Sequence, residues 1–312
     1  MTRKNLLRLI VAFGSLALGT LSAQAQAYNY TSIDYPKAIR TRTFGIGPGG
    51  VIVGDYRDSS ATLHGFLLIG GRYITVDVPG ALVGLTGVLP TSLKGINPAG
   101  DIVGFYLVPP GSTEACTVAA TPPCQKGFLL HRGVFSTVVP EGHEGSIPQR
   151  ITPTGNIYGC YHDLDYMGSM FGFTRTSSGE FTSTNVPASM SNGATPDGST
   201  IVGLYTDMSM MPSHDHGYLI QNGHFQPFDV PGSTLTWAWD INPSGTIIGE
   251  FRDAAGVFHG FLRTAAGYTS IDFPAAIGTH AIGINPGGAI VGTYTDTNNV
   301  THGFLATPTE EN

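Results

Sequence analysis

Charged residues are scarce in this chain of 312 residues and make up only 12% of it. Basic residues are the scarcer kind, with 15 Lys and Arg against 22 Asp and Glu and a formal net charge of −7. Nucleic acids and anionic membrane surfaces are recognised through basic patches. The composition therefore argues against both as partners.

Long apolar runs are also missing. The apolar run at residues 9–18 is shorter than the roughly 20 residues that a membrane-spanning helix needs, and no later run approaches that length. It follows the basic residues Arg3, Lys4 and Arg8 and leads into the small residues of 22–27. This order is typical of a secretory signal peptide and predicts no membrane span.

We therefore expect residues 1–27 to be a signal peptide, cleaved after Ala25 or Ala27, and the protein to be secreted, periplasmic or extracellular. Without this segment, 12 basic residues face 22 acidic ones, a net charge near −10. The mature chain is then still less suited to nucleic acid.

Cysteine is rare and the common catalytic motifs are absent. Cys116 and Cys124 lie eight residues apart in a Pro-rich insertion, which in an oxidising compartment predicts a disulfide between them. Cys160 lies in a strand-like run and is expected to be a buried small apolar residue. No P-loop, dinucleotide fingerprint, His-Glu-x-x-His or Gly-x-Ser-x-Gly stands in a supporting context, so no motif identifies a reaction.

Glycine and proline are abundant, with 43 and 21 residues, and they recur beside Val, Ile, Tyr and Phe. Short runs of β-branched and aromatic residues that are bounded by Gly and Pro predict many short strands. The glycine of an Ile-Val-Gly motif returns every 43 to 55 residues and defines six units. These glycines are Gly54, Gly104, Gly159, Gly203, Gly249 and Gly292.

Each unit is long enough for four short strands. The first leads into an Asn-Pro-x-Gly turn, as at 285–288, where Pro sets φ and Gly accepts a positive φ. The second carries Ile-Val-Gly-x-Tyr, whose glycine is expected to let a neighbouring backbone or ring approach closely. The third carries His-Gly-Phe-Leu, as at 302–305, and the fourth Tyr-x-x-Ile-Asp-x-Pro, as at 268–274.

This period with four strands per unit predicts an all-β fold, a six-bladed β-propeller, over a single domain of residues 28–306 with a tail at 307–312. The last unit lacks a fourth strand, whereas residues 30–36 at the start match one. A ring explains the split, because the N-terminal strand completes the last blade and removes two open sheet edges. A seven-bladed ring and an array of β-sandwiches are the alternatives.

The repeat resembles the bacterial extracellular HAF repeats, which are built on Asn-x-x-Gly-x-Ile-Val-Gly-x-Tyr and a His-Ala-Phe tripeptide. The resemblance covers residues 30–305, although Gly replaces Ala of the tripeptide at His64, His216, His259 and His302. It implies a secreted, propeller-like protein. It implies no general activity and transfers no catalytic residue.

Acidic and His residues that recur once per unit are expected to be structural, because a catalytic site needs one asymmetric group. An acid follows the second strand, a His opens the third, and an Asp ends the fourth. We interpret them as hydrogen-bond partners that close loops, since an imidazole both donates and accepts. They are Asp58, Asp163, Asp207, Asp253 and Asp296, then His64, His216, His259 and His302, then Asp34, Asp77, Asp229 and Asp272.

The first strand of each unit is expected to line the central channel, and its residues differ from unit to unit. Cationic and aromatic side chains there predict a site for an anionic or sugar-like ligand, through bidentate and stacking contacts. The predicted ligand-binding residues are Arg42, Lys94, Arg150, Trp237, Trp239 and His280. One of the two tryptophans is expected to pack between blades.

Residues that break the repeat lie in the long loops, mostly of units three and four. Imidazoles beside carboxylates are suited to a divalent cation or to acid–base chemistry, although their spacing matches no metal signature. His143, His162, Asp163 and His214 are the candidate metal ligands, and solvated loop residues are the simpler interpretation. No cofactor is otherwise expected.

Three functions follow as hypotheses. The first is a secreted module that binds an extracellular ligand, preferably a carbohydrate or an anionic small molecule. The second is an extracellular polysaccharide lyase or hydrolase, with His162 or His214 as base and Arg150 or Lys94 neutralising charge. The third is a structural surface or matrix protein. Neither the ligand nor the oligomeric state follows from the sequence.

Overall fold

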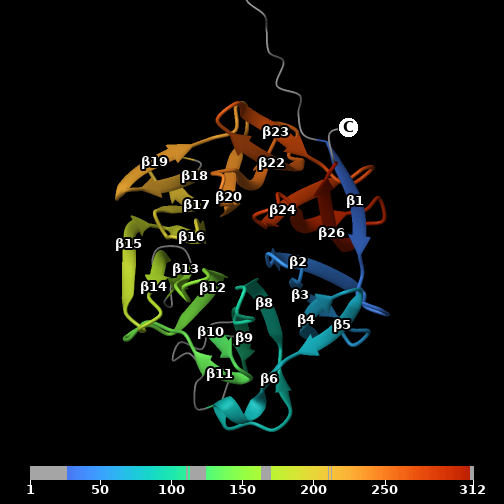
Figure 1. The fold of residues 1–312 in the computed structure, drawn as a ribbon, viewed down its shortest axis with the longest axis vertical. Coiled ribbons are helices and arrows are strands. Elements are labelled where there is room, and N and C mark those ends of the chain that lie inside the picture. The colour runs from blue at the N-terminus through green and yellow to red at the C-terminus, as the bar shows by residue number, and fades with distance from the viewer. Residues whose placement is uncertain are drawn as a thin grey trace, which may run out of the picture.

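Six four-stranded antiparallel sheets make up most of the computed structural model, which describes residues 27–109, 112, 124–162, 170–209, 211 and 213–309. The sheets stand around a central axis like the blades of a propeller, each with one strand near the axis and one at the rim (Figure 1). The predicted all-β, six-bladed β-propeller is confirmed.

The strands of each blade follow the chain from the axis to the rim. Blade one is β2 (Arg40–Ile46), β3 (Ile52–Arg57), β4 (Leu63–Ile69) and β5 (Arg72–Val76). Blade two is β8 (Thr91–Ile96), β9 (Ile102–Val108), β10 (Cys124–His131) and β11 (Val134–Thr137). Blade three is β12 (Gly145–Ile151), β13 (Ile157–His162), β14 (Phe171–Arg175) and β15 (Phe181–Pro187).

The second half of the ring repeats this plan. Blade four is β16 (Ser189–Ala194), β17 (Thr200–Asp207), β18 (His214–Gln221) and β19 (His224–Phe228). Blade five is β20 (Leu235–Ile241), β21 (Ile247–Arg252), β22 (Phe258–Thr264) and β23 (Gly267–Ile271). Blade six is β24 (Gly278–Ile284), β25 (Ile290–Thr295), β26 (Thr301–Pro308) and β1 (Tyr28–Ile33). A small hairpin of β6 (Val78–Pro79), η1 (Gly80–Val83) and β7 (Val88–Leu89) joins blades one and two.

The N-terminal strand closes the ring. β1 pairs antiparallel with β26, from Tyr28 opposite Pro308 to Ile33 opposite Gly303, so the two ends of the chain share one sheet (Figure 1). Just beyond the paired residues, Nδ1 of His302 lies 2.7 Å from the carboxylate of Asp34. The predicted completion of the last blade by the N-terminal strand is therefore confirmed.

The glycine of each Ile-Val-Gly motif is required by close packing inside the blade. A Cβ on Gly292 would overlap the carbonyl oxygen of His280 on β24 and the ring of Phe304 on β26. The ring of Phe304 is fully buried and packs in a cluster with Ile248 of the neighbouring blade. The repeated Gly and Phe thus allow tight packing both within and between blades.

The Asn-Pro-x-Gly turns gather at one mouth of the channel. Their last residues, such as Gly245 and Gly288, have positive φ, which glycine adopts at little cost. The side-chain oxygen of Asn285 accepts a hydrogen bond from the backbone amide of Ala289, which stabilises the turn. Prolines of all six turns line a cavity of about 100 Å³ at this mouth.

The His and Asp residues that recur in blades one, four, five and six are hydrogen-bond partners, as predicted. The Nδ1 atom of the repeat His lies 2.7 Å from Asp77 at His64 and 3.1 Å from Asp272 at His259. The carboxylate after the second strand accepts backbone amides of its own turn, as Asp58 does from Ser60 and Thr62. These residues order the loops in the four blades.

Two cysteine predictions have different outcomes. Cys160 is fully buried and free, as predicted, and burial raises the pKa of its thiol to about 12. Cys116 lies outside the described residues, so its disulfide with Cys124 stays a prediction.

The predicted signal peptide lies almost wholly outside the described residues, which begin at Ala27. Within the described part of the chain, no helix is long and apolar enough to span a membrane.

Candidate functional site

A cavity of about 380 Å³ opens at the channel mouth opposite the proline turns. Four of the predicted ligand-binding residues line it: Arg42, Lys94, Trp239 and His280. They come from the inner strands β2, β8, β20 and β24, which converge at the axis (Figure 1). We call this cavity the channel-mouth pocket; Arg40, Phe44, Glu250, Ile282, Thr293, Thr295 and Thr301 complete its lining.

Arg42 is held by a buried carboxylate in its own blade. Its Nε and Nη2 donate to the two oxygens of Asp55 at 2.9 and 2.6 Å, and the hydroxyl of Ser92 donates to the same carboxylate at 2.8 Å. Burial alone would raise the pKa of Asp55, but the Arg42 charge and hydrogen bonds hold it below its usual value. Arg42 is therefore a fixed cation whose charge is already balanced.

Lys94 brings a buried amine to the pocket. It is 9% exposed, and its Nζ lies 3.3 Å from the ring centroid of Phe44. Among the described residues, no hydrogen bond or ion pair engages Nζ. Burial, reinforced by the Arg42 charge, lowers the pKa of Lys94 to about 7. The amine therefore carries a proton only part of the time at neutral pH.

His280 and Glu250 form a second charge pair in the pocket. Nδ1 of His280 lies 2.6 Å from Glu250, whose side chain is almost fully buried. Burial alone would lower the pKa of His280, but the Glu250 charge and hydrogen bond raise it above its usual value. This pair is close to neutral overall when the imidazole is protonated.

Two further donors in the pocket lack a partner among the described residues. The indole Nε1 of Trp239 and the guanidinium Nε of Arg40 are buried, and neither donates to an acceptor in that part of the chain. Burial, with the repulsion of Arg42, lowers the pKa of Arg40 to about 10, so Arg40 stays charged at neutral pH. Buried unpaired donors are rare in folded proteins and favour an acceptor from outside.

Arg150 lies deeper in the channel than the pocket. Its Nε donates to Asp240 at 2.9 Å, and its terminal nitrogens donate to the carbonyls of Lys94, Gln149 and Ile282. These partners belong to blades two, three, five and six. Arg150 thus joins blades across the axis and separates the channel-mouth pocket from the cavity under the proline turns.

Of the two tryptophans of β20, Trp239 lines the channel-mouth pocket and Trp237 does not. Nε1 of Trp237 donates to Asp215 of blade four at 3.0 Å. The two rings meet edge to face with centroids 6.1 Å apart. Trp237 therefore packs between blades and supports Trp239, which lines the pocket.

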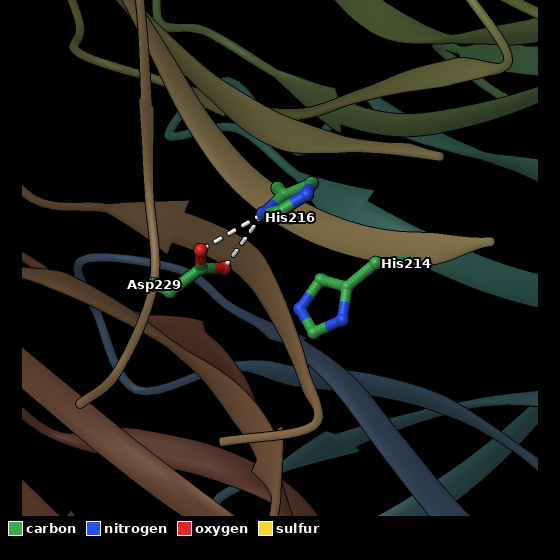
Figure 2. Close-up of side chains that lie close together, drawn as sticks. All are labelled: His214, His216 and Asp229. Atoms are coloured by element: carbon green, nitrogen blue, oxygen red, sulfur yellow. Dashed lines mark hydrogen bonds and ion pairs between the residues drawn. The ribbon is translucent and has the colours of Figure 1, made fainter. Parts of the chain in front are cut away.

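Blade four holds the group of side chains shown in Figure 2, which consists of His214, His216 and Asp229. Nδ1 of His216 lies 2.8 Å from Asp229, and the ring of His214 lies 4.4 Å from that of His216 between centroids. One potential ligand atom from each residue lies within 4.8 Å of the others. We call this group the blade-four cluster.

Of the other predicted loop residues, only the side chain of His143 belongs to the described part of the chain. The ring of His143 lies against that of Tyr161, with centroids 4.2 Å apart and the ring planes tilted by 43°. The side chain of His162 and the whole of Asp163 lie outside the described part of the chain. Within that part, no contact joins His214 to Arg150 or Lys94.

A larger hollow, of about 620 Å³, lies between the turns of blades four and five. Asp197 and Arg263 are the charged residues of its lining, which otherwise consists of turn and strand residues. It gathers no set of unpaired donors comparable to that of the channel mouth among the described residues, so we place the candidate site in the smaller cavity.

Three residues of the site, Arg40, Glu250 and Asp55, were not predicted from the sequence. Arg40 precedes Arg42 by two residues and thus shares its face of β2, which strand alternation could have indicated. Asp55 and Glu250 directly follow the repeat glycine, where the other units have no acid. An acidic residue at a strand position that is uncharged in the other units could have indicated that these two residues belong to a site.

Comparisons with family models and with curated proteins find no match. Among solved structures, the chain is similar to an acylaminoacyl peptidase from Pyrococcus horikoshii, at 11% identity and a TM-score of 0.52, over 86% of this chain and 44% of that one. It is also similar to the β-propeller domain of the Trilobed protease from Pyrococcus furiosus, at 8% identity and a TM-score of 0.50, over 88% and 85%. Putative TolB from Agrobacterium tumefaciens follows, at 14% identity and a TM-score of 0.49, over 73% and 75%.

At these identities the likeness shows the fold alone: the chain is a six-bladed β-propeller. The Pyrococcus furiosus domain has an open velcro topology, whereas β1 closes the ring here. The resemblance to HAF repeats finds no support from a family model and stays a prediction.

Proposed function

We propose that the protein is an exported binding module whose channel-mouth pocket takes an anionic ligand, with an acidic sugar as the preferred class. The observation that carries this proposal is the surplus of donors in the pocket. Asp55 balances Arg42 and Glu250 balances His280, so Arg40 and Lys94 remain without an ion-pair partner among the described residues. A carboxylate entering the pocket would balance them.

The aromatic lining supports a sugar as the preferred class. The indole of Trp239 supplies an apolar face and an N–H donor without a partner among the described residues, and Thr293, Thr295 and Thr301 add hydroxyl-bearing side chains to the lining. Pockets that bind sugars combine an aromatic face with a few directed polar groups. An acidic sugar uses all of these groups together.

Titration with galacturonate oligosaccharides tests the proposal, with neutral galactose oligosaccharides of the same length as the matched ligands. Isothermal calorimetry is expected to show saturable binding of the acidic series and at least tenfold weaker binding of the neutral one. Equal affinity for both series, or no binding of either together with no binding of simple carboxylates, would contradict it.

Replacing Lys94 with methionine or Arg40 with glutamine is expected to raise the Kd of the acidic ligand at least tenfold, about 1.4 kcal/mol. Each change removes a cation without an ion-pair partner while keeping the apolar part of the side chain. Arg72→Gln is the matched control, since Arg72 is an exposed cation on the rim strand β5. An equal loss in this control would assign the effect to the overall charge of the protein.

Anion affinity is expected to fall about tenfold between pH 6 and pH 8. The pKa of Lys94 is lowered to about 7, so the amine is charged at pH 6 and mostly neutral at pH 8. A ligand that requires the charged form must then bring a proton with it. Calorimetry at both pH values in the wild type and in Lys94→Arg measures this, and the variant should lose most of the dependence because arginine stays charged.

A further inference from the structure

The blade-four cluster departs from the repeat in a way that favours a ligand. In blades one, five and six the repeat His lies between two carboxylates, with Nε2 3.6 Å from Asp58, 3.5 Å from Asp253 and 3.6 Å from Asp296. In blade four the corresponding Asp207 also accepts groups of its own turn, the amide and hydroxyl of Ser209, but it forms no ion pair with His216. No carboxylate there lies within ion-pair distance of His216 Nε2 in the described part of the chain.

A second imidazole takes part in this blade. The residue two places before the repeat His is Thr62, Val257 or Val300 in the other blades and His214 in blade four. His214 and His216 share one face of β18, because side chains alternate along a strand. Asp215, between them, lies on the opposite face of β18 and accepts a hydrogen bond from Nε1 of Trp237.

The His216 ring is already oriented for a ligand. Tyr205 stacks on it with centroids 5.2 Å apart and an angle of 25° between the ring planes, and Asp229 faces its Nδ1 atom. His216 is 17% exposed and Asp229 is 39% exposed in their side chains, so solvent ions reach the cluster. The stacked Tyr205 ring thus fixes the imidazole, while Nδ1 of His216 and the Asp229 carboxylate lie close enough to share one cation.

We propose that His214, His216 and Asp229 form a binding site for a divalent transition-metal cation of the Zn²⁺ type. Two imidazole nitrogens and one carboxylate are ligands that Zn²⁺ accepts, and they leave a fourth position for water or for a group of a partner. Their ligand atoms lie within 4.8 Å of one another. Tetrahedral Zn²⁺ needs them about 3.3 Å apart, so binding of the ion would draw the ligand atoms closer together. The site is independent of the channel-mouth pocket and its ligand.

Calorimetric titration of the whole protein with Zn²⁺ is the test, together with Co²⁺, whose visible absorption reports the coordination. One Zn²⁺ per chain is expected, with the Co²⁺ spectrum showing coordination by imidazole and carboxylate. His214→Val gives blade four the residue of blades five and six and should weaken binding at least tenfold without altering the melting temperature of the metal-free protein. Asp229→Asn should weaken it as well.

His259→Gln is the matched control, because it removes the repeat pair of blade five, where Val257 stands in place of a second imidazole. It is expected to leave Zn²⁺ affinity and stoichiometry unchanged. Wild-type Zn²⁺ binding in His214→Val, or the absence of saturable binding in the unmodified protein, would overturn the proposal. An equal loss in His259→Gln would also overturn it, since the binding would then follow from the repeat pair in general.

Discussion

Replacing Arg150 with alanine is expected to lower the free energy of unfolding by about 3–5 kcal/mol, the usual effect of removing one partner of a buried ion pair. Arg150 is 9% exposed and donates to oxygens from four different blades around the axis. Its loss leaves the buried Asp240 carboxylate without its cationic partner and removes one donor from each of three buried carbonyls. The effect of this one side chain therefore reaches four blades at once.

Urea denaturation followed by fluorescence measures this effect. Arg72→Ala, at an exposed cation of β5, is the control and should change stability by no more than about 0.5 kcal/mol. The double change Arg150→Met with Asp240→Asn removes both charges and keeps an oxygen that can accept the Ile284 amide. It should recover at least half of the loss, and a variant as unstable as Arg150→Ala would show that the unpaired charge is not the cause.

Deleting β1 is expected to destabilise the ring by about 5 kcal/mol or more. The deletion removes six residues that pair with β26, at about 1 kcal/mol for each ladder hydrogen bond. It also removes the Tyr30 ring, which packs against Phe273 at 5.7 Å between centroids. The exposed edge of β26 then offers unpaired backbone groups for aggregation.

Thermal unfolding and light scattering of a protein that begins at Lys37 measure this prediction. A synthetic peptide of residues 28–36 should restore part of the lost stability, because it can pair with β26 in trans. A peptide with the same residues in scrambled order is the control. Unchanged melting of the shortened protein would contradict it and would indicate a ring that is stable when open.

The blades were predictable from sequence because their signals are local and repeated. A turn such as 285–288 requires Pro and a glycine with positive φ, and the period-two pattern of each strand needs no knowledge of distant residues. The displaced strand at 30–36 revealed the closure, because a ring brings the two parts of a split repeat together and an open array leaves them apart. Each turn or strand pattern is a weak signal alone, but its recurrence in six units was enough to predict the fold.

The candidate pocket was predictable only in part. Arg42, Lys94, Trp239 and His280 follow from the rule that first strands line the channel. Arg150 obeys the same rule, yet it lies deeper and bonds across the axis. The depth of a residue in the channel depends on the register between blades, which no local pattern contains.

The blade-four cluster shows a different kind of failure. His216 was interpreted as a repeat residue and His214 as a loop residue, and each interpretation agrees with its own contacts. Their combination with Asp229 arises only after β18 pairs with β19 and brings Asp229 next to His216. A residue can therefore belong to a structural repeat and still take part in a candidate metal site.

The sequence by itself determined the number of blades, their strands, their turns and the strand that closes the ring, since these depend on residues near in the chain or on copies of one motif. The tertiary structure alone decided which side chains meet at the channel mouth, which remain unpaired and which are used to join the blades. The physical reason is that partners such as Arg150 and Asp240 lie 90 residues apart. Their contact depends on how the blades are placed around the closed ring, and the repeat motif by itself does not indicate which residues of different blades meet.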